Sequence, residues 1–447
     1  MNDSLVNDLR QDNIRFVRIV WCDNANIIRA KAAHIDSLDM FIQNGVGITV
    51  AQQALPVMGD SVVPETGLGP VGEVRLMPDW STLKRLPYAP GHALVLSDMV
   101  AGPERTPWSL CPRNFLRRQV AALAAEGLHI KMAFENEFFL LSRTERGNLV
   151  PADDSVFAAT SAMNLHCELI NALADALTSQ GLTVEGYYPE SGPGQQELVI
   201  GYGEAMEAAD RQVIYRETAR GVALNHGLIA SFLPKIVEDR AGSGCHINIS
   251  LWQGDDNITG DPDSPDGIGS RAAAFIAGLL EHLPGLTALT IPSKSSFRRI
   301  QPHFWAGAFT CWGYDNREAA VRVSRNAAGT CAGRFEFKVS DATANPYLCA
   351  GALVAAGLDG IRRELRLPEE VCVDPGRIPE AERRQRGIHL LPRNLGEAVA
   401  ALERDEVLCG ALGQDLSRAY LAIRRTEWEA LKNLSLEEEV EMLAERY

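Results

Sequence analysis

An apolar stretch from Met132 to Leu141, MAFENEFFLL, carries two glutamates, Glu135 and Glu137, two residues apart. On a β-strand this spacing places both carboxylates on one face. Two like charges among phenylalanines would repel each other and lose hydration. The chain must therefore fold so that this strand lies at a wet edge or holds something positive between its carboxylates.

Three further strand-like segments show the same alternation of polar and apolar residues: YYPESGPGQQELVI (187–200), GSGCHINIS (242–250) and GRFEFKVS (333–340). Taken alone, a glutamate on a strand is usually solvated, and a lone histidine is usually a structural residue. Together, the four segments supply five carboxylates and one imidazole on strands that one sheet would gather. Such ligands suit Mg²⁺ or Mn²⁺ better than structural zinc, and two divalent ions bridged by phosphate would explain the clustered charge. The predicted ligands are Glu135, Glu137, Glu190, Glu197, His246 and Glu336.

The C-terminal half also contains a set of basic residues: Arg298, Arg299, Arg317, Arg322, Arg334 and Lys338. Such side chains can clamp the oxygens of a carboxylate or of a transferring phosphoryl group. On spacing alone, surface salt bridges explain them equally well. The chain has no G-x-x-x-x-G-K-[ST] motif, so a P-loop would not hold a bound ATP.

Charge and cysteine content argue against several classes of protein. The formal net charge of −15 disfavours a surface for nucleic acid or anionic membrane, although a local arginine cluster can still bind an anionic substrate. Nine cysteines are scattered without a C-x-x-C pair, which fits a reducing cytoplasm. The N-terminal segment has no apolar signal core, and we find no run of about 18 apolar residues. We therefore expect a cytoplasmic protein without a membrane segment.

The order of elements predicts an α+β protein with two domains, 1–107 and 108–447. The first domain begins with two strands within 14–33, around the turn Asp23–Asn26. The later strands are neither evenly spaced nor continuously apolar, so we expect an antiparallel sheet rather than a doubly wound parallel one. Strands are predicted at 130–141, 194–201, 244–251 and 332–339, helices at 113–126, 163–180, 204–226, 270–289, 346–365 and from about 396, and a polar loop at 255–267.

Six segments together point to one family. FENEFF, ESGPGQQE, GSGCHINIS, SSFRRIQP, DNREAAVRV and RFEFKVSDATANPYL resemble, in order and spacing, the signature segments of the glutamine synthetase family. The resemblance covers the whole chain and is strongest from residue 108 onward. It implies an N-terminal β-grasp domain and a catalytic domain with a curved antiparallel sheet and flanking helices. It also implies an ATP-dependent ligase that forms γ-glutamyl phosphate, uses two or three Mg²⁺ (or Mn²⁺) ions, and assembles as two stacked hexameric rings with active sites between subunits.

The resemblance assigns metal and glutamate roles to individual residues. The implied ligands of a first metal ion are Glu137, Glu190 and Glu197, and those of a second, which bridges the ATP phosphates, are Glu135, His246 and Glu336. The two glutamates of the opening stretch would then face the same way because each holds a different ion. The residues implied for the substrate glutamate are Glu137, Gly242, His246 and Arg299.

Phosphate and nucleotide contacts are implied for a second group of residues. Arg317 and Arg322 match arginines that stabilise phosphate, and Lys338 stands where the family has an arginine aimed at the transferred group. With Arg299, these residues form the implied catalytic set, which would neutralise the charge that spreads over the transferring oxygens. The implied ATP contacts are Glu185, Asn248, Ser250, Arg322 and Arg334, with Asn248 in place of a histidine that many members have.

Two departures from the family bear on the amine substrate. The flap glutamate that follows the substrate arginine by six residues is Trp305 here, next to Phe304, and an aspartate of the N-terminal domain aligns roughly with Thr49. An ammonium ion needs carboxylates that hold it and remove a proton. We therefore expect an amine with an apolar body that is neutral near pH 7, such as aniline. The chain would then resemble the non-ammonia γ-glutamyl-amine ligases, such as γ-glutamylanilide synthase or γ-glutamylpolyamine synthetase.

Three alternatives stay open at this stage. Polyamines and aliphatic amines, including ethanolamine, are the runner-up acceptors, with a cation–π contact to Trp305 in place of the missing carboxylates. Trp305 can instead be a flap residue that only seals the site from water. If the alignment of Thr49 and Trp305 with the family is wrong, the chain would be an ordinary glutamine synthetase. A catalytically inactive relative is the third alternative, but a complete set of unneutralised carboxylates argues against it. The expected partners are L-glutamate, ATP and an amine.

Overall fold

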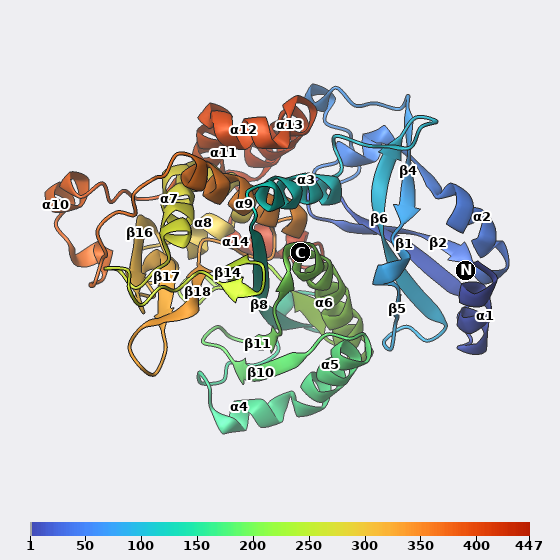
Figure 1. Cartoon of the computed structure of the whole chain (residues 1–447). Coiled ribbons are helices and arrows are strands. Elements are labelled where there is room, and N and C mark those ends of the chain that lie inside the picture. The colour runs from blue at the N-terminus through green and yellow to red at the C-terminus, as the bar shows by residue number, and fades with distance from the viewer. Residues whose placement is uncertain (1) are drawn as a thin grey trace.

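The computed structural model describes residues 2–447, whose helices flank two β-sheets (Figure 1). The N-terminal sheet contains β1 (Phe16–Cys22), β2 (Ile28–His34), β3 (Val46–Thr49), β4 (Glu73–Pro78), β5 (Lys84–Arg85), β6 (His92–Ala101) and β7 (Thr106–Pro107), accompanied by α1 (Asn2–Gln11) and α2 (Leu38–Asn44). The main strand order is β2-β1-β6-β4-β3. β1 runs antiparallel to β2 and parallel to β6, so this sheet is mixed, in keeping with the expected β-grasp domain.

The turn between β1 and β2 forms where the sequence predicts it, and a buried aspartate explains why. Asp23 Oδ1 accepts the backbone N–H groups of Ala25 at 3.0 Å and Ile27 at 2.8 Å. Its Oδ2 accepts a hydrogen bond from Arg29 Nε at 2.6 Å. The carboxylate therefore closes the turn in place of backbone acceptors, as aspartate commonly does.

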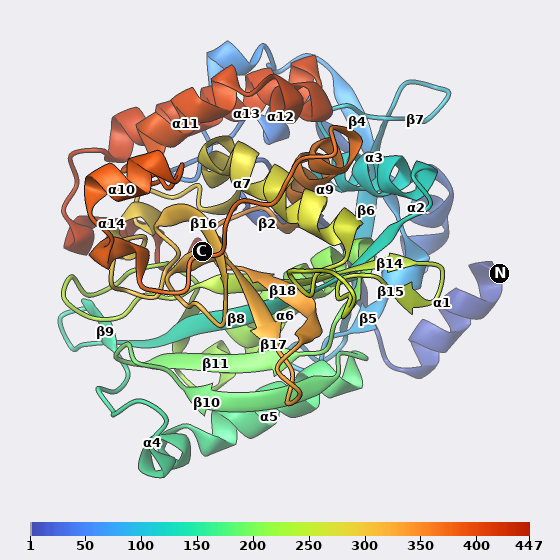
Figure 2. The same cartoon turned by 60° about the vertical axis from the view of Figure 1, so that its left-hand side comes forward.

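The second sheet contains β8 (His129–Arg143), β10 (Val184–Pro189), β11 (Gln195–Ile200), β14 (Cys245–Gln253), β16 (Phe309–Tyr314), β17 (Ala319–Arg325) and β18 (Cys331–Phe337). These strands lie in the order β10-β11-β8-β14-β18-β17-β16 (Figure 2). The short strands are β9 (Leu149–Pro151), β12 (Gly203–Glu204) and β13 (Ile229–Ser231), which pair with β8, and β15 (Asp256–Asn257), which pairs with β14.

One edge of the second sheet differs from the expected antiparallel arrangement. β16 and β17 run parallel, whereas the other strand pairs of this sheet are antiparallel. Parallel strands begin at the same end of a sheet. The short link 315–318 must therefore carry the chain from the end of β16 back to the level of its start. The alternation of side chains along a strand does not encode its direction, and the sequence therefore gave no sign of this exception.

Four long helices pack against the second sheet and supply most of its core: α3 (Pro112–Ala125), α6 (Ala205–Asn225), α7 (Ser270–Thr290) and α9 (Pro346–Arg362). α7 and α9 approach closely at Gly278, where a Cβ atom would lie 2.2 Å from the Ala356 carbonyl oxygen. Within residues 2–447, α7 alone has the length and apolar character of a membrane span. The fold buries 83% of the most apolar window of α7, as expected for the core helix of a globular domain.

The predicted helix 163–180 is wrong as a continuous element. The chain forms α4 (Thr160–Leu165) and α5 (Cys167–Ser179), and His166 between them leaves the helical conformation. His166 Nε2 lies 2.9 Å from Asp153 Oδ2, and this contact with an earlier loop accounts for the break. The other predicted strands and helices are confirmed with shifted ends, and 255–267 is irregular apart from β15. The remaining helices are α8 (Ser296–Arg299), α10 (Glu380–Gln385), α11 (Leu395–Arg404), α12 (Glu406–Leu412), α13 (Gln414–Leu431) and α14 (Leu436–Leu443).

Candidate functional site

The register of the second sheet brings the predicted acidic and imidazole side chains together. Glu197 of β11 lies opposite Glu137 of β8, and His246 of β14 lies opposite Glu135 of β8. Side chains directly opposite one another on neighbouring strands share a face. The expectation that one sheet gathers these strands is therefore confirmed.

The row of polar side chains continues onto β18, and a cavity covers it. Glu336 lies opposite Asn248 of β14 on one side and opposite Arg322 of β17 on the other. The cavity has a volume of about 510 Å³, and we call it the acidic cavity. All six predicted metal ligands line it, together with Gly242, Arg299, Phe304, Trp305, Arg317, Arg322 and Lys338.

Glu336 is the carboxylate that the protein itself neutralises. His246 Nδ1 lies 3.1 Å and Lys338 Nζ 3.4 Å from Glu336 Oε1, and Arg322 donates to the other oxygen. Burial opposes ionisation, but Lys338, His246 and Arg322 hold the pKa of Glu336 well below its usual range. Glu135, His246 and Glu336 each offer one ligand atom, and these atoms lie within 4.8 Å of one another. This spacing allows the three side chains to share one ion.

Glu190 and Glu197 have no comparable cation, since neither forms an ion pair with any described residue. Burial and the charge of Glu137 raise the pKa of both, that of Glu197 to about 8. Neutral donors orient this group of carboxylates. The Tyr188 hydroxyl donates to Glu197 Oε2 at 2.7 Å, and the Gln195 amide donates to Glu137 Oε2 at 2.8 Å. The protein thus holds carboxylates in place without neutralising them.

This donor set fits a hard divalent ion. The buried Nε2 atom of His246 has no hydrogen-bond partner within residues 2–447. The other ring nitrogen, Nδ1, lies 3.7 Å from Glu135, 3.9 Å from Glu137 and 3.1 Å from Glu336, and carboxylate oxygens with an imidazole nitrogen are ligands that Mg²⁺ and Mn²⁺ accept. The described lining of the acidic cavity contains no cysteine, so a zinc–thiolate site does not fit. The unneutralised carboxylates and the imidazole nitrogen Nδ1 that faces them are suited to bind such an ion.

Arg299, which is implied for the substrate α-carboxylate, is almost fully buried at the wall of the acidic cavity. It donates from Nη2 to the Ser340 carbonyl oxygen at 2.8 Å, whereas its Nε has no partner among the described residues. Gly242 lies against it: a Cβ atom there would lie 2.3 Å from the Pro234 carbonyl oxygen and 3.0 Å from Arg299 Cγ. The backbone can therefore approach the guanidinium only because residue 242 lacks a side chain. The free N–H of Arg299 suits a carboxylate.

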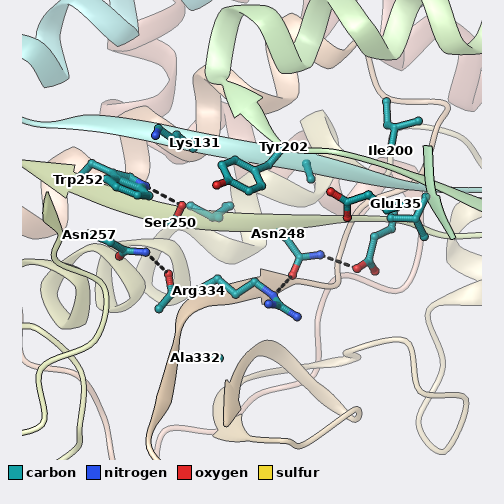
Figure 3. Close-up of a pocket in the computed structure, with 15 residues that line it drawn as sticks. Lys131, Glu135, Ile200, Tyr202, Asn248, Ser250, Trp252, Asn257, Ala332 and Arg334 are labelled. Carbon is teal, nitrogen blue, oxygen red and sulfur yellow. Dashed lines mark hydrogen bonds between the residues drawn. The ribbon is translucent and has the colours of Figure 1, made fainter. Parts of the chain in front are cut away.

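A second cavity of about 480 Å³ adjoins the acidic cavity through Glu135, which lines both (Figure 3). Arg334 Nε donates to Asn248 Oδ1 at 3.1 Å, and Asn248 Nδ2 donates to Glu135 Oε1 at 2.6 Å. These bonds connect the two cavities through side chains. Of the residues implied for ATP, Arg322 lies in the acidic cavity and four lie in the second cavity: Glu185, Asn248, Ser250 and Arg334.

Lys131, Trp252 and Tyr202 are among the residues of the second cavity that sequence reasoning missed. Lys131 Nζ lies 3.8 Å from the centroid of the Trp252 ring, and Trp252 Nε1 donates to Ser250 Oγ at 2.9 Å. Tyr202 exposes most of its ring there. Aromatic faces beside a cation suit a planar base with attached phosphates. Trp252 follows Ser250 by two positions on one strand, and this shared face is a signal that could have identified it.

Four aromatic side chains also line the acidic cavity, and we call this group the aromatic end: Phe157, Tyr188, Phe304 and Trp305. Trp305 is 65% exposed, Phe304 55% and Phe157 51%. Phe157 and Tyr188 meet edge to face with their ring centroids 6.2 Å apart. Sequence reasoning identified Phe304 and Trp305 but missed Phe157, which lies in a loop, and Tyr188, which lies on β10.

Cations lie against Phe304 and Trp305, whereas the Tyr188 hydroxyl contacts the Glu197 carboxylate. Lys235 Nζ lies 5.3 Å from the centroid of Phe304, and Arg317 Cζ lies 6.0 Å from that of Trp305. Glu318, the carboxylate bonded to the Trp305 backbone, is absent from the described cavity lining. The aromatic end therefore offers apolar surface and positive charge.

Two residues considered from the sequence lie elsewhere. Thr49 ends β3 in the N-terminal sheet, opposite Glu73, and does not line the acidic cavity of its own chain. Its assignment to the amine pocket stays a prediction that requires a neighbouring copy. Arg298 lies 3.0 Å from Glu238 and 3.2 Å from Glu439, so the salt-bridge explanation holds for this residue.

Comparisons with known proteins cover the whole chain. The family model described as the glutamine synthetase catalytic domain matches residues 109–443, and the one described as the glutamine synthetase N-terminal domain matches residues 1–108. Type-1 glutamine synthetase 1 of Dictyostelium discoideum is 33% identical over 463 residues, which cover 98% of this chain and 91% of that protein. Gamma-glutamylpolyamine synthetase GlnA3 of Streptomyces coelicolor is 37% identical over 438 residues, which cover 96% of this chain and 93% of that protein. A solved structure described as a GmaS/ADP complex has a TM-score of 0.84 and 29% identity, with 98% of this chain and 99% of that chain covered.

Proposed function

This chain belongs to the glutamine synthetase family of ATP-dependent ligases, and on that premise we propose that it joins the γ-carboxyl group of L-glutamate to an amine other than ammonia. The proposed amine has an aromatic or apolar body, with aniline as the reference compound. ATP would phosphorylate the γ-carboxylate, so that its oxygen leaves as phosphate when the amine attacks the carbonyl carbon. The aromatic end of the acidic cavity is the observation that carries the proposal.

Two residues would hold the substrate glutamate. Arg299 pairs with its α-carboxylate, since the guanidinium has an N–H group without a protein partner and sits at the cavity wall. The backbone at Gly242 would lie along the amino end of the substrate, where a larger residue would clash with Pro234 and Arg299. This placement directs the γ-carboxylate toward the basic residues of β17 and β18.

The phosphoryl group would lie over the sheet, where charges of both signs meet. Arg317, Arg322 and Lys338 line the acidic cavity and would stabilise the charge on the transferring oxygens. Mg²⁺ ions held by the six predicted ligands would supply further neutralisation of phosphate charge. Lys338 provides a point charge without the two-pronged geometry of an arginine, so it would position the group less strictly.

The aromatic end supports an amine that needs no carboxylate. An ammonium ion must be held and deprotonated before it can attack, and Lys235 and Arg317 would instead repel a cation that approached the rings. A weakly basic arylamine is already neutral at pH 7. It would bury its ring against Phe157, Phe304 and Trp305, which are all at least half exposed to the cavity and its mouth.

A polyamine is the second candidate, because the relative from Streptomyces coelicolor is described as a gamma-glutamylpolyamine synthetase. The charges at the aromatic end weigh against it. The carboxylates that line the described cavity are the predicted metal ligands, which leaves none to pair with a second ammonium group. A polyamine would have to bind the faces of Phe304 and Trp305 in competition with Lys235 and Arg317.

The assembly is part of the proposal. Two stacked hexameric rings would place the N-terminal domain of one subunit beside the acidic cavity of the next. Thr49, which a single chain leaves outside the cavity, would then lie near the aromatic end. A hydroxyl there, in place of a carboxylate, would also favour a neutral amine.

Phosphate release from the purified protein with ATP, Mg²⁺ and L-glutamate tests the proposal. Ammonium, aniline, ethylamine, ethanolamine and putrescine are compared at equal concentrations and one pH. We expect aniline to give the highest rate and ammonium to give little above background. A leading rate with putrescine would favour the polyamine candidate, and a leading rate with ammonium would identify an ordinary glutamine synthetase.

A further inference from the structure

The turn 302–306, which carries Trp305 to the acidic cavity, is held from outside that cavity by one buried carboxylate. Glu318 is only 6% exposed. Its Oε1 accepts the backbone N–H of Trp305 at 2.8 Å, and its Oε2 accepts the backbone N–H of His303 at 3.2 Å. Each carboxylate oxygen therefore holds one residue of the turn.

Both residues of the turn need such support. The backbone φ angle is +67° at His303 and +56° at Trp305, in the left-handed region that residues with a side chain disfavour. Hydrogen bonds to an ionised acceptor are stronger than those to a neutral one. The two hydrogen bonds to Glu318 thus offset the free energy that the left-handed backbone conformation costs at His303 and Trp305.

Glu318 is itself fixed by neighbouring segments. Asn316 Oδ1 accepts the Glu318 backbone N–H at 3.0 Å, and the Asn316 amide donates to two backbone carbonyl oxygens of the segment 371–373 at 2.7 and 3.0 Å. His303 Nδ1 lies 2.7 Å from Asp374 Oδ2, just beyond this segment. The turn is therefore attached at both ends to the same part of the fold.

The residue before Glu318 contacts Trp305 from the cavity side. Arg317 lines the acidic cavity and lies 6.0 Å from the indole centroid of Trp305. Arg317 and Glu318 are consecutive, so one short link contacts both the ring and the backbone of the same tryptophan. The position of the indole is thus coupled to an arginine that is predicted to stabilise phosphate.

We propose that Glu318 is a positioning residue for amine specificity, which fixes Trp305 so that the indole walls the acceptor end of the cavity. The identity of the amine rests on the proposed function, but the position of the indole does not. A fixed indole gives the amine a rigid face and keeps water from the acyl phosphate. When the two backbone bonds are lost, the turn relaxes and both effects weaken.

Glu318→Gln tests this inference, with Glu370→Gln as the matched control. Glutamine keeps the size of the side chain, but only one of its two terminal atoms can accept a hydrogen bond, so one N–H of the turn loses its partner. Glu370 also accepts a backbone N–H, that of Tyr314 at 3.0 Å, and bonds no residue of the turn. The control variant therefore also replaces a carboxylate that accepts a backbone N–H, but it does so beside a neighbouring strand and not at the turn.

The kinetic readout separates positioning from general damage. We expect Glu318→Gln to raise the KM for the best amine about tenfold and the KM for glutamate and ATP by less than about twofold. Phosphate release without amine should increase, because water reaches the acyl phosphate. Glu370→Gln should match the unmodified protein. An equal rise in all three KM values, or no change in the KM for the amine, would overturn the inference.

A second readout does not depend on the amine. The fluorescence anisotropy of Trp305 is obtained as the difference between each protein and its Trp305→Phe counterpart. This anisotropy should fall in Glu318→Gln and stay unchanged in Glu370→Gln. An unchanged anisotropy in Glu318→Gln overturns the positioning role. A lower anisotropy in a protein that prefers ammonium supports the positioning role and contradicts the proposed function. Glu318→Asp keeps the charge but has a shorter side chain. This variant replaces Glu318→Gln in both measurements if Glu318→Gln does not fold.

Discussion

The two ends of the acidic cavity are built in different ways. At the sheet, the carboxylates project from neighbouring strands whose register fixes their spacing. At the aromatic end, the rings come from three separate segments: the loop before α4, strand β10 and the turn 302–306. Under the proposed function, the sheet end would serve phosphoryl transfer, the step that ligases of this family share. The aromatic end can vary between relatives without disturbing the sheet, so it is where amine specificity can change.

The two ends also differ in charge. Glu197 forms no ion pair with any described residue, and burial and a neighbouring carboxylate raise its pKa to about 8. The aromatic end has the opposite composition, with Lys235 and Arg317 beside the rings. Under the proposed function, this contrast would suit metal cations at one end and a neutral amine at the other.

The largest effect is expected at the sheet end. Glu197→Gln removes a predicted metal ligand, and it should lower turnover with every amine by about 10²-fold or more, because metal stabilisation of phosphoryl charge contributes several kcal/mol. Turnover as a function of Mg²⁺ concentration is the measurement. Tyr188→Phe, which removes only the hydroxyl that donates to Glu197, is the control and should lose much less. Turnover above a tenth of normal in Glu197→Gln would exclude the assigned role.

The next effect tests whether specificity can be moved to ammonium. Trp305→Glu places a carboxylate where the family has one, and it should shift the ratio of kcat/KM for ammonium over aniline by about 10- to 100-fold. Trp305→Gln is the matched control, since it removes the indole without adding charge. If both variants lose aniline activity and neither gains ammonium activity, Trp305 only seals the cavity.

A smaller effect is expected at Phe157, which the sequence did not reveal as a site residue. Phe157→Ala removes one face of the aromatic end, and it should raise the KM for aniline about 3- to 10-fold, as expected from loss of an aromatic contact. Ammonium-dependent turnover should not change. Leu165→Ala on α4, another exposed apolar residue, is the control because it does not line the described cavity. An equal change for aniline and ammonium would place Phe157 outside the amine pocket.

His282 offers a third environment, in which the fold itself supplies a cation to two partly buried carboxylates. His282 Nδ1 lies 2.8 Å from Asp405 Oδ2, and its Nε2 lies 3.0 Å from Asp359 Oδ2. Burial lowers the pKa of His282, but the two carboxylates outweigh burial and raise it above the ordinary value. Its contribution to the free energy of unfolding is therefore complete below about pH 6.5 and is lost as the pH rises through the folded-state pKa.

Urea unfolding, measured from below about pH 6.5 to above the folded-state pKa of His282, checks this effect. It should be the smallest of the predicted effects. The free energy of unfolding should fall by about 1–3 kcal/mol as the charged hydrogen bonds of His282 are lost. His282→Gln, which does not titrate, should show a flatter dependence over the same range. An identical pH dependence in both proteins would mean that His282 does not titrate with folding.

The sheet end could be predicted from the sequence because a strand alternates with period two. Glu135 and Glu137 share a face for that reason, and so do His246, Asn248 and Ser250. The order of the strands was not predicted, since the family resemblance implied only a curved antiparallel sheet. Parallel pairing of β16 and β17 was not predicted, because alternation is the same for both strand directions.

The aromatic end could be predicted only in part, because its residues meet through the tertiary fold. Trp305 was found as a departure from a family motif, whereas Phe157 and Tyr188 belong to no local pattern. Glu318 was missed for a similar reason. Its role depends on two left-handed residues of a turn more than ten positions earlier, and no sequence rule predicts that conformation at His303 and Trp305.

Direct competition between two amines tests the central claim most simply. The purified protein is given ATP, Mg²⁺ and L-glutamate with equal concentrations of ammonium and aniline, and mass spectrometry measures the ratio of γ-glutamylanilide to glutamine at early time. This ratio equals the ratio of the two kcat/KM values times the ratio of the amine concentrations. We expect γ-glutamylanilide to dominate by at least about tenfold, the scale of one apolar pocket contact. A product that is mainly glutamine would contradict the account.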